Sequence, residues 1–168
     1  MDWSKIETFL TSGQAFIPVN LHDKGDCIEM YMKDGSVQAL EIQSEQFLKK
    51  LLYYFGTSVS ANKRRYGKLV GKTKLVPIVL SYGITLIPYL VREPIGRQSR
   101  VGWFIARQIL GFQKESPHKT SIQLSNHDIS VFHSEKFCFE QLKNARCIEL
   151  CFGEIHEPHR KSWLFSTG

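Results

Sequence analysis

Short apolar runs separated by turn residues predict three β-hairpins along the chain. In the first, Lys33-Asp34-Gly35 separates two such runs, and an Asp-Gly turn between apolar runs is a typical hairpin connection. In the second, Pro77 and Pro88 indicate strands that are not fully paired on both sides, because proline lacks the N–H that a central strand needs. The hairpins are expected at residues 27–42, 75–91 and 121–132, with further strands at 15–20 and 101–114.

Two stretches have the spacing of amphipathic helices. Between residues 47 and 55 the apolar positions recur at i, i+1, i+4, i+5 and i+8, which places them on one face of a helix. Ser44 is expected to cap this helix and Gly56 to end it. A second helix is expected over residues 134–152, with Gly153 as its stop.

Residues 57–74 differ from the rest of the chain. This segment is rich in glycine and lysine and lacks a broad apolar face, so we expect a loop that leads into a strand. Three hairpins and two main helices predict an α+β domain built on antiparallel sheet. The domain is expected to cover residues 1–153, and residues 154–168 are expected to form a C-terminal tail.

The net charge of +6 is concentrated in the middle of the chain. Residues 1–56 carry a net charge of −3, residues 57–119 carry +10, and residues 120–168 carry −1. A positive region between mildly acidic ends predicts a localised anion-binding face, and DNA is the anion that we expect. The candidate DNA-binding residues are Lys63, Arg64, Arg65, Lys68, Lys72, Lys74, Arg97 and Arg100.

Flexible Lys/Arg loops suit phosphate contacts, and arginine suits the narrow minor groove of A/T-rich DNA, whose negative potential attracts guanidinium groups. There is no helix-turn-helix pattern and no zinc-finger spacing, so a recognition helix in the major groove is not expected. Tyr66, Tyr82 and Trp103 could stack on single-stranded bases, although periodicity favours a core position for Trp103.

Two motifs resemble ligand sites but lack the required spacing. Gly67-Lys68-Leu69-Val70-Gly71-Lys72-Thr73 has three residues between its glycines, whereas a phosphate-binding loop needs four. Cys147, Cys151, His156 and His159 are possible zinc ligands, but the first two are spaced for packing on a helix and no Cys-x-x-Cys pair is present. We therefore expect no metal and no cofactor. No nucleophile lies near a histidine in a catalytic pattern, and no enzymatic activity is expected.

Several features occur together in a fixed order over residues 45–150. They are Tyr54-Phe55-Gly56-Thr57-Ser58, the Lys/Arg cluster that follows, paired short strands with Pro88 in the second, Gly102-Trp103, and the Ser125-Asn126 turn. This ordered set resembles the competence transcription factor (ComK) family of low-GC Gram-positive bacteria. The resemblance implies a homo-oligomeric activator of DNA-uptake genes that binds paired A/T-rich boxes, largely through the minor groove, and bends the DNA.

The resemblance also implies roles for individual residues. The residues matching DNA contacts are Lys63, Arg64 and Arg65, followed by Lys68 and Arg97, whereas Gly56 and Trp103 match framework positions. The partners implied are RNA polymerase and a proteolytic adaptor. The sequence departs from the family at Val101, where a cysteine is usual, and in its shorter tail, where Trp163-Leu164-Phe165 matches the adaptor signal only loosely.

The location expected from the sequence is the cytoplasm. The first residues are polar, no apolar run is long enough to span a membrane, and the four cysteines indicate reduced thiols. Two other functions fit the same basic segment. One is binding of RNA or single-stranded nucleic acid, and the other is a protein-interaction module whose basic face docks an acidic partner.

Overall fold

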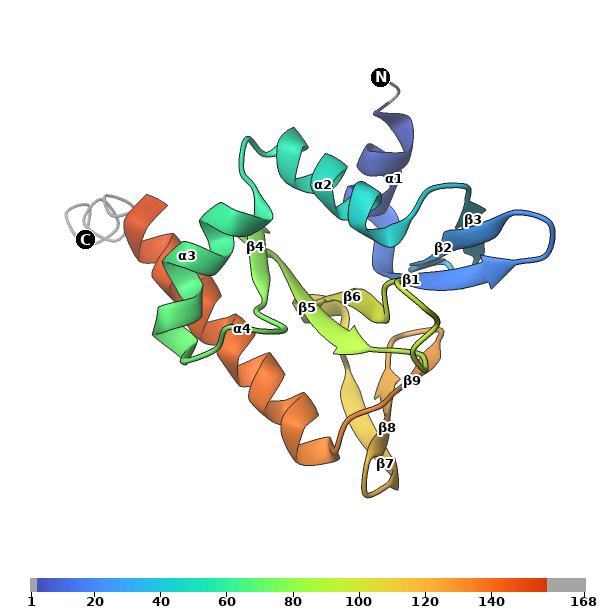
Figure 1. Cartoon of the computed structure of the whole chain (residues 1–168). Coiled ribbons are helices and arrows are strands. Elements are labelled where there is room, and N and C mark those ends of the chain that lie inside the picture. The colour runs from blue at the N-terminus through green and yellow to red at the C-terminus, as the bar shows by residue number, and fades with distance from the viewer. Residues whose placement is uncertain (1–2, 157–168) are drawn as a thin grey trace.

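The computed structural model describes residues 3–156, which form four α-helices, one 3-10 helix and nine strands (Figure 1). The elements are α1 (Ser4–Ser12), β1 (Gly13–Leu21), β2 (Gly25–Met32), β3 (Val37–Leu40), α2 (Ser44–Tyr54), α3 (Val59–Val70), β4 (Ile78–Ser81), β5 (Ile84–Leu90), β6 (Val101–Ile105), η1 (Ala106–Gln108), β7 (Gly111–Ser116), β8 (Lys119–Gln123), β9 (Asp128–Val131) and α4 (Glu135–His156). The α+β class is confirmed. The two helices expected over residues 47–55 and 134–152 are present as α2 and α4, and α1 and α3 are helical in addition.

Two antiparallel sheets organise these elements. One has six strands in the order β3-β2-β1-β6-β5-β4, and the other has three in the order β7-β8-β9. The three predicted hairpins are present as β2-β3, β4-β5 and β8-β9. The single strand predicted over residues 101–114 is wrong. Ala106 and Ile109 both pack into one core, and three-residue spacing puts side chains together on a helical turn but on opposite faces of a strand.

The larger sheet separates two apolar cores. On one face α1 and α2 contribute Phe9, Phe47 and Leu51, which pack against Phe16 and Met30 of the sheet. On the other face the smaller sheet and α4 cover a second core (Figure 1). A third, smaller cluster, formed by Tyr66, Val76, Val79 and Ile148, joins α3 to β4 and α4.

The ends of α2 and α4 differ in part from expectation. Gly56 follows α2 with φ of 69° and ends it as predicted, but Ser44 is the first helical residue, and its Oγ donates a hydrogen bond to the Val101 carbonyl instead of capping. Ser134 does cap α4, because its Oγ accepts a hydrogen bond from the Phe137 N–H at 3.1 Å. Gly153 is not a stop. It is not among the glycines with positive φ, and the helix continues to His156.

The predicted tail therefore begins inside a helix. Residues 154–156 belong to α4, and the remainder of the predicted tail, including Trp163-Leu164-Phe165, lies outside the described residues.

Pro88 interrupts the sheet as the sequence predicted. Strand β5 pairs with β6 through Leu90, with Pro88 opposite Trp103, but its last partner in β4 is opposite Leu86. The side chain of Gln141 on α4 bridges the resulting gap, since its Nε2 donates to the carbonyl oxygens of Leu75 at 2.9 Å and Pro88 at 3.1 Å. An amide from a distant helix thus replaces missing ladder hydrogen bonds.

Candidate nucleic-acid interface

The basic segment 57–74 is mainly a helix, α3, and not the predicted loop. Ser58 caps it by accepting a hydrogen bond from the Ala61 N–H at 3.1 Å. Gly71 ends it in the left-handed conformation with φ of 68°, and the Lys72 N–H donates to the Gly67 carbonyl at 2.9 Å. Ser58 and Gly71, a capping residue and a terminal glycine separated by the length of a helix, are the features of the sequence that indicate this helix.

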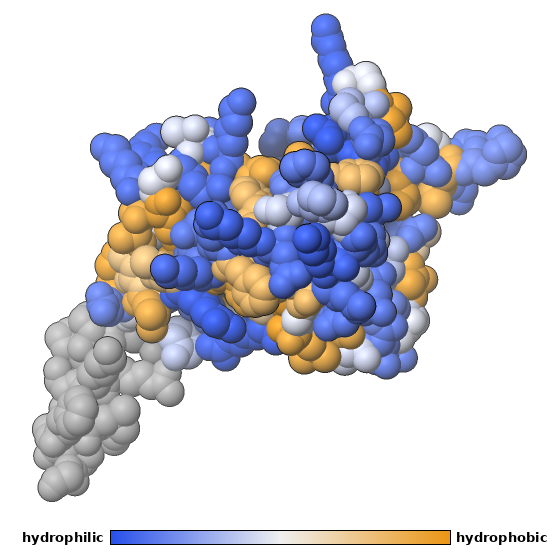
Figure 2. All heavy atoms as spheres, turned by 90° about the horizontal axis from the view of Figure 1, so that it is seen from below, coloured by the Kyte–Doolittle hydropathy of each residue, from blue (hydrophilic) through white to orange (hydrophobic). Residues whose placement is uncertain are grey.

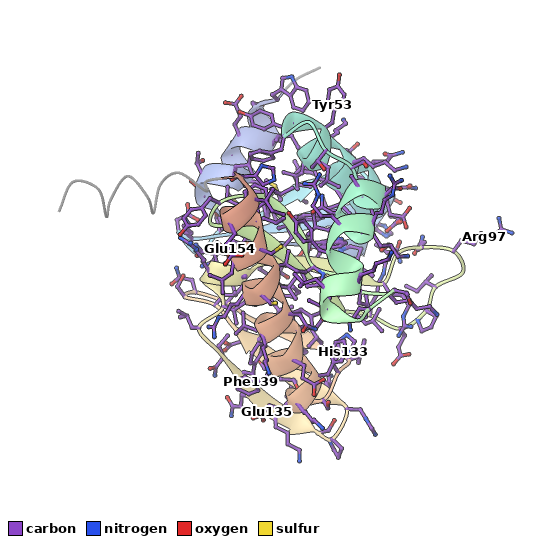
Figure 3. All side chains as sticks on the ribbon, turned by 90° about the vertical axis from the view of Figure 1, so that its left-hand side faces the viewer. Tyr53, Arg97, His133, Glu135, Phe139 and Glu154 are labelled. Carbon is purple, nitrogen blue, oxygen red and sulfur yellow. The ribbon has the colours of Figure 1, made fainter. Side chains whose placement is uncertain are left out.

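Helix α3 is held in place by polar as well as apolar contacts. Asn62 is buried, and its Oδ1 accepts a hydrogen bond from the Val79 N–H of edge strand β4 at 3.2 Å. Tyr66 is fully buried against Val76 and Ile148. Its ring is therefore not available to stack on bases, contrary to the sequence-based expectation. These contacts place α3 beside α4 (Figures 1 and 3), with its basic side chains facing outward.

A shallow basic groove runs along the outer side of α3 and the segment that follows it. The residues that line this basic groove are Ser60, Lys63, Arg64, Gly67, Lys68, Lys72 and Thr73. Four of the predicted DNA-binding residues are brought together here, and no acidic residue of the described chain lines the groove. Close approach of the returning segment depends on Gly67, where a Cβ would lie 2.9 Å from the Lys72 carbonyl oxygen.

A second hollow, the Trp103 pocket, adjoins the basic groove. The residues that line it are Val59, Lys63, Thr73, Lys74, Leu75, Val76, Ile78, Pro88, Val101 and Trp103. Its volume is about 300 Å³, and it shares Lys63 and Thr73 with the basic groove. Trp103 packs on the first core with part of its surface and remains partly exposed. The framework role expected for Trp103 therefore applies only to the part of its side chain that packs on the core.

Lys72 and Arg100 extend the positive surface toward the 91–100 loop, and His133 lies near both of them. The Lys72 Nζ lies 4.8 Å from the centre of the Phe137 ring, and burial lowers the pKa of Lys72. The His133 ring stacks on the same phenyl ring at 4.2 Å, and its Nε2 accepts a hydrogen bond from the Leu90 N–H. Burial, then the charges of Lys72 and Arg100, lower the pKa of His133 to about 4. A neutral imidazole thus lies between two cations.

The arginines of the 91–100 loop have different surroundings. Arg92 is partly buried and forms an ion pair with Asp26 at 2.9 Å, which anchors the loop to β2. Arg100 donates from its Nε to the Arg92 carbonyl at 3.0 Å. Arg97 points away from the body of the molecule at the tip of the loop (Figure 3). The hollow at the base of this loop includes Asp26 and Glu45, so the charge near Arg97 is mixed.

The predicted residues therefore fall into four groups. Lys63, Arg64, Lys68 and Lys72 line the basic groove, and Lys74 lines the Trp103 pocket. Arg97 and Arg100 belong to the separate loop. Arg65 lines neither hollow, and its guanidinium carbon lies 5.9 Å from the centre of the Tyr66 ring. Residues that sequence reasoning missed are Ser60, Thr73, Val101 and Pro88, which no local pattern connects to the cationic residues.

Tyr82, another predicted stacking residue, faces a different hollow. The Arg107 guanidinium carbon lies 5.4 Å from its ring centre, and Arg107 pairs with Glu149 of α4 at 3.0 Å. Leu142 and Leu150 of α4 are also part of the lining of this hollow. The view from below shows many hydrophilic side chains with several apolar groups between them (Figure 2). Tyr82 is therefore not part of the basic surface.

The described residues contain no group of three or more His, Cys, Asp or Glu side chains that could hold a metal ion. Cys147 and Cys151 of the possible zinc motif lie on α4, and His159 lies outside the described residues. In residues 3–156, no helix combines the length and the apolar content needed to cross a membrane.

Fold and site together define an α+β protein with a cationic surface formed by a helix and the loop that follows it. Comparisons with models of protein families, with curated proteins and with solved structures found no significant match to the chain.

Proposed function

We propose that the protein binds double-stranded A/T-rich DNA and activates transcription of DNA-uptake genes as a homo-oligomer. The observation that carries this proposal is the basic groove, where Lys63, Arg64, Lys68 and Lys72 come together and no acidic residue of the described chain is part of the lining. The resemblance to the competence transcription factor family supports the same conclusion, because its Lys/Arg positions match Lys63, Arg64 and Lys68 of this groove. In this proposal the protein works in the cytoplasm by binding alone, without catalysis, metal or cofactor.

The two parts of the surface suit different contacts. The basic groove offers several flexible cations at the surface, which favours binding to successive phosphates. Arg97 is a single arginine on an extended loop, which favours insertion into a narrow minor groove. Phosphate contacts would then position the protein, and Arg97 would favour A/T-rich sites. RNA polymerase and a proteolytic adaptor are further partners in this proposal.

The first prediction concerns the salt dependence of binding. The variant K63A/R64A/K68A should bind an A/T-rich duplex far more weakly than the wild type. Because each phosphate contact contributes roughly 0.9 to the slope of log K against log salt, the slope should fall by about 2.7. Fluorescence anisotropy at several salt concentrations measures both quantities.

A control variant removes the same charge elsewhere. Lys5, Lys49 and Lys143 are exposed lysines outside the basic groove, so K5A/K49A/K143A should keep most of the slope. Equal slopes for the two triple variants would contradict the assigned interface. No binding of the wild type to A/T-rich duplex at low salt would instead favour an acidic protein partner.

Binding to RNA or single-stranded nucleic acid is the second candidate function, because the partly exposed Trp103 lies next to the basic groove. Competition of labelled duplex with unlabelled single strands of DNA and RNA separates the two functions. Netropsin, which occupies the minor groove of A/T-rich duplex, should displace the protein if Arg97 enters that groove. Displacement by the major-groove ligand methyl green alone would place α3 in the major groove.

A further inference from the structure

We propose that the Trp103 pocket binds one unpaired nucleotide, with its base against Trp103 and its phosphate between Lys63 and Lys74. This inference rests on the proposed function and specifies a ligand for the pocket that adjoins the basic groove. The pocket has an apolar floor that includes Pro88, Val101 and the partly exposed Trp103. Aromatic side chains bind bases by stacking, in a way that tolerates different sequences because every base has a π-face.

The polar residues at the pocket suit a phosphate. Lys63 and Lys74 supply positive charge, Thr73 supplies a hydroxyl donor, and no acidic residue of the described chain lines the hollow. Lys63 and Thr73 line the basic groove as well. A strand whose phosphates follow the basic groove would therefore reach the pocket without crossing a region of opposite charge. The ligand is thus expected as a unit of a longer strand.

The wall of the pocket is held in a strained shape. Leu75 has φ of 51°, in the left-handed region that costs a non-glycine residue about 1–2 kcal/mol. Its carbonyl is fixed by Gln141, whose amide also binds the carbonyl of Pro88, another residue of the pocket lining. Residues in such conformations persist only where the surroundings enforce them, and they concentrate at ligand sites. Two residues of the lining are thus held by one side chain of α4, which prepares the pocket before a ligand arrives.

The volume agrees with this ligand class. About 300 Å³ is at the lower end of the range for small-molecule sites, so it suits a single nucleotide and not a base pair. Extruding a base from a duplex costs a few kcal/mol, and least where the base is already unpaired. A duplex with a bulged nucleotide is therefore the suitable probe, because its unpaired base can enter the pocket without the cost of breaking a base pair.

The experiment compares two A/T-rich duplexes that differ only by one bulged adenine. Since stacking of one base contributes roughly 1–3 kcal/mol, the bulged duplex should bind wild type about tenfold more tightly. In W103L and in K74A the affinity for the bulged duplex should approach that for the paired duplex, whereas W103F should keep most of the preference. K114A removes an exposed lysine that lines neither the pocket nor the basic groove, and it serves as the charge control.

Thermal unfolding of each variant shows whether it is folded, and K74A keeps the test decisive if W103L unfolds, because Lys74 is exposed. A second arm uses equilibrium dialysis with adenosine monophosphate, which separates a free nucleotide from a nucleotide within a strand.

Four outcomes are distinct. Preference for the bulge that is lost in K74A supports the pocket and the proposed function together. Duplex binding without preference for the bulge overturns the pocket and leaves the proposed function intact. Binding of adenosine monophosphate, lost in K74A, without any binding to DNA supports the pocket as a free-nucleotide site and overturns the proposed function. Absence of both overturns both.

Discussion

His133 shows how a single residue can remain uncharged inside a positive surface. Its Nε2 accepts a hydrogen bond from the Leu90 N–H, so this nitrogen carries no proton, and the neighbouring Lys72 and Arg100 disfavour a third charge. The ring also stacks on Phe137, which connects the start of α4 to the end of α3 through Lys72. Protonation would therefore weaken a contact between two parts of the candidate interface.

The second prediction follows from this imidazole. The pKa of His133 is lowered from 6.5 to about 4 in the folded protein, so the unfolded chain takes up a proton at a pH where the folded protein does not. The contribution of His133 to stability is complete above pH 6.5 and is lost as the pH falls toward 4. Urea unfolding at several pH values should show a smaller loss over this window in H133Q, whose amide oxygen can still accept the hydrogen bond.

H118Q changes an exposed histidine and is the matched control, and its unfolding should follow the wild type. The same pH dependence in H133Q and in the wild type would contradict the role assigned to His133.

At the scale of elements, two helix-interior glycines differ in what surrounds them. A Cβ at Gly67 in α3 would lie 2.9 Å from the backbone oxygen of Lys72, which returns along the helix. A Cβ at Gly153 in α4 would have the Tyr82 ring at 3.6 Å as its nearest neighbour, an ordinary contact. Because glycine is equally unfavourable in both helices, the atoms around each position determine whether an alanine there raises or lowers the free energy of unfolding.

The third prediction is that alanine has opposite effects at these two positions. G153A should raise the free energy of unfolding by about 0.5–1 kcal/mol, the usual gain from replacing a helical glycine. G67A should lower it by roughly 1–2 kcal/mol, because the segment with Lys72 must shift. Urea unfolding measures both, and G67A should also bind A/T-rich duplex more weakly. Stabilisation by G67A would contradict the tight approach of this segment.

The elements whose buried faces are apolar could be predicted from the sequence. Helix α2 is an example, because Phe47, Leu48, Leu51 and Leu52 are all buried and follow the helical period. Helix α3 could not be predicted from its apolar residues, since the positions it buries are Asn62, Tyr66 and Gly67. Its stability depends on contacts with β4 and α4, which are distant in sequence. The hydrophobic pattern of a segment therefore predicts a helix only where the surface that the helix packs against requires an apolar face.

The candidate site was predictable in its charge and not in its shape. Lys63, Arg64 and Lys68 are neighbours in sequence and remain neighbours in space, so counting charges located the basic groove. The Trp103 pocket combines α3, the segment before β4, and strands β5 and β6, and no spacing rule connects these segments. Arg65 was predicted with its neighbours, but a side chain on a helix points in a different direction from the next one.

On the scale of the whole molecule, the basic groove and the Arg97 loop are separate parts of one proposed interface. In Figure 3 the Arg97 loop extends beyond α3, on the side away from α4. Binding at both parts requires a ligand long enough to contact each of them. A duplex meets this requirement, whereas a short acidic peptide would bind at one part only.

The fourth prediction separates the two parts by sequence preference. R97A should reduce the preference for A/T-rich over G/C-rich duplex, because the narrow minor groove attracts arginine chiefly in A/T-rich DNA. K68A should weaken binding to both duplexes by a similar factor and lower the salt slope by about 0.9. Affinity measurements with both duplexes at one salt concentration give the preference. An unchanged preference in R97A would exclude this arginine from the minor groove.

The bridge made by Gln141 has a consequence for how the protein is made. Its amide binds Leu75 and Pro88, which precede it by 66 and 53 residues. During translation, the cationic helix and Trp103 leave the ribosome well before the side chain that fixes the pocket walls. Contacts over such separations form slowly because long loops must close first. A nascent chain would thus present its positive charges to nucleic acid before it could hold a base, and selectivity would appear only when α4 had been synthesised and docked.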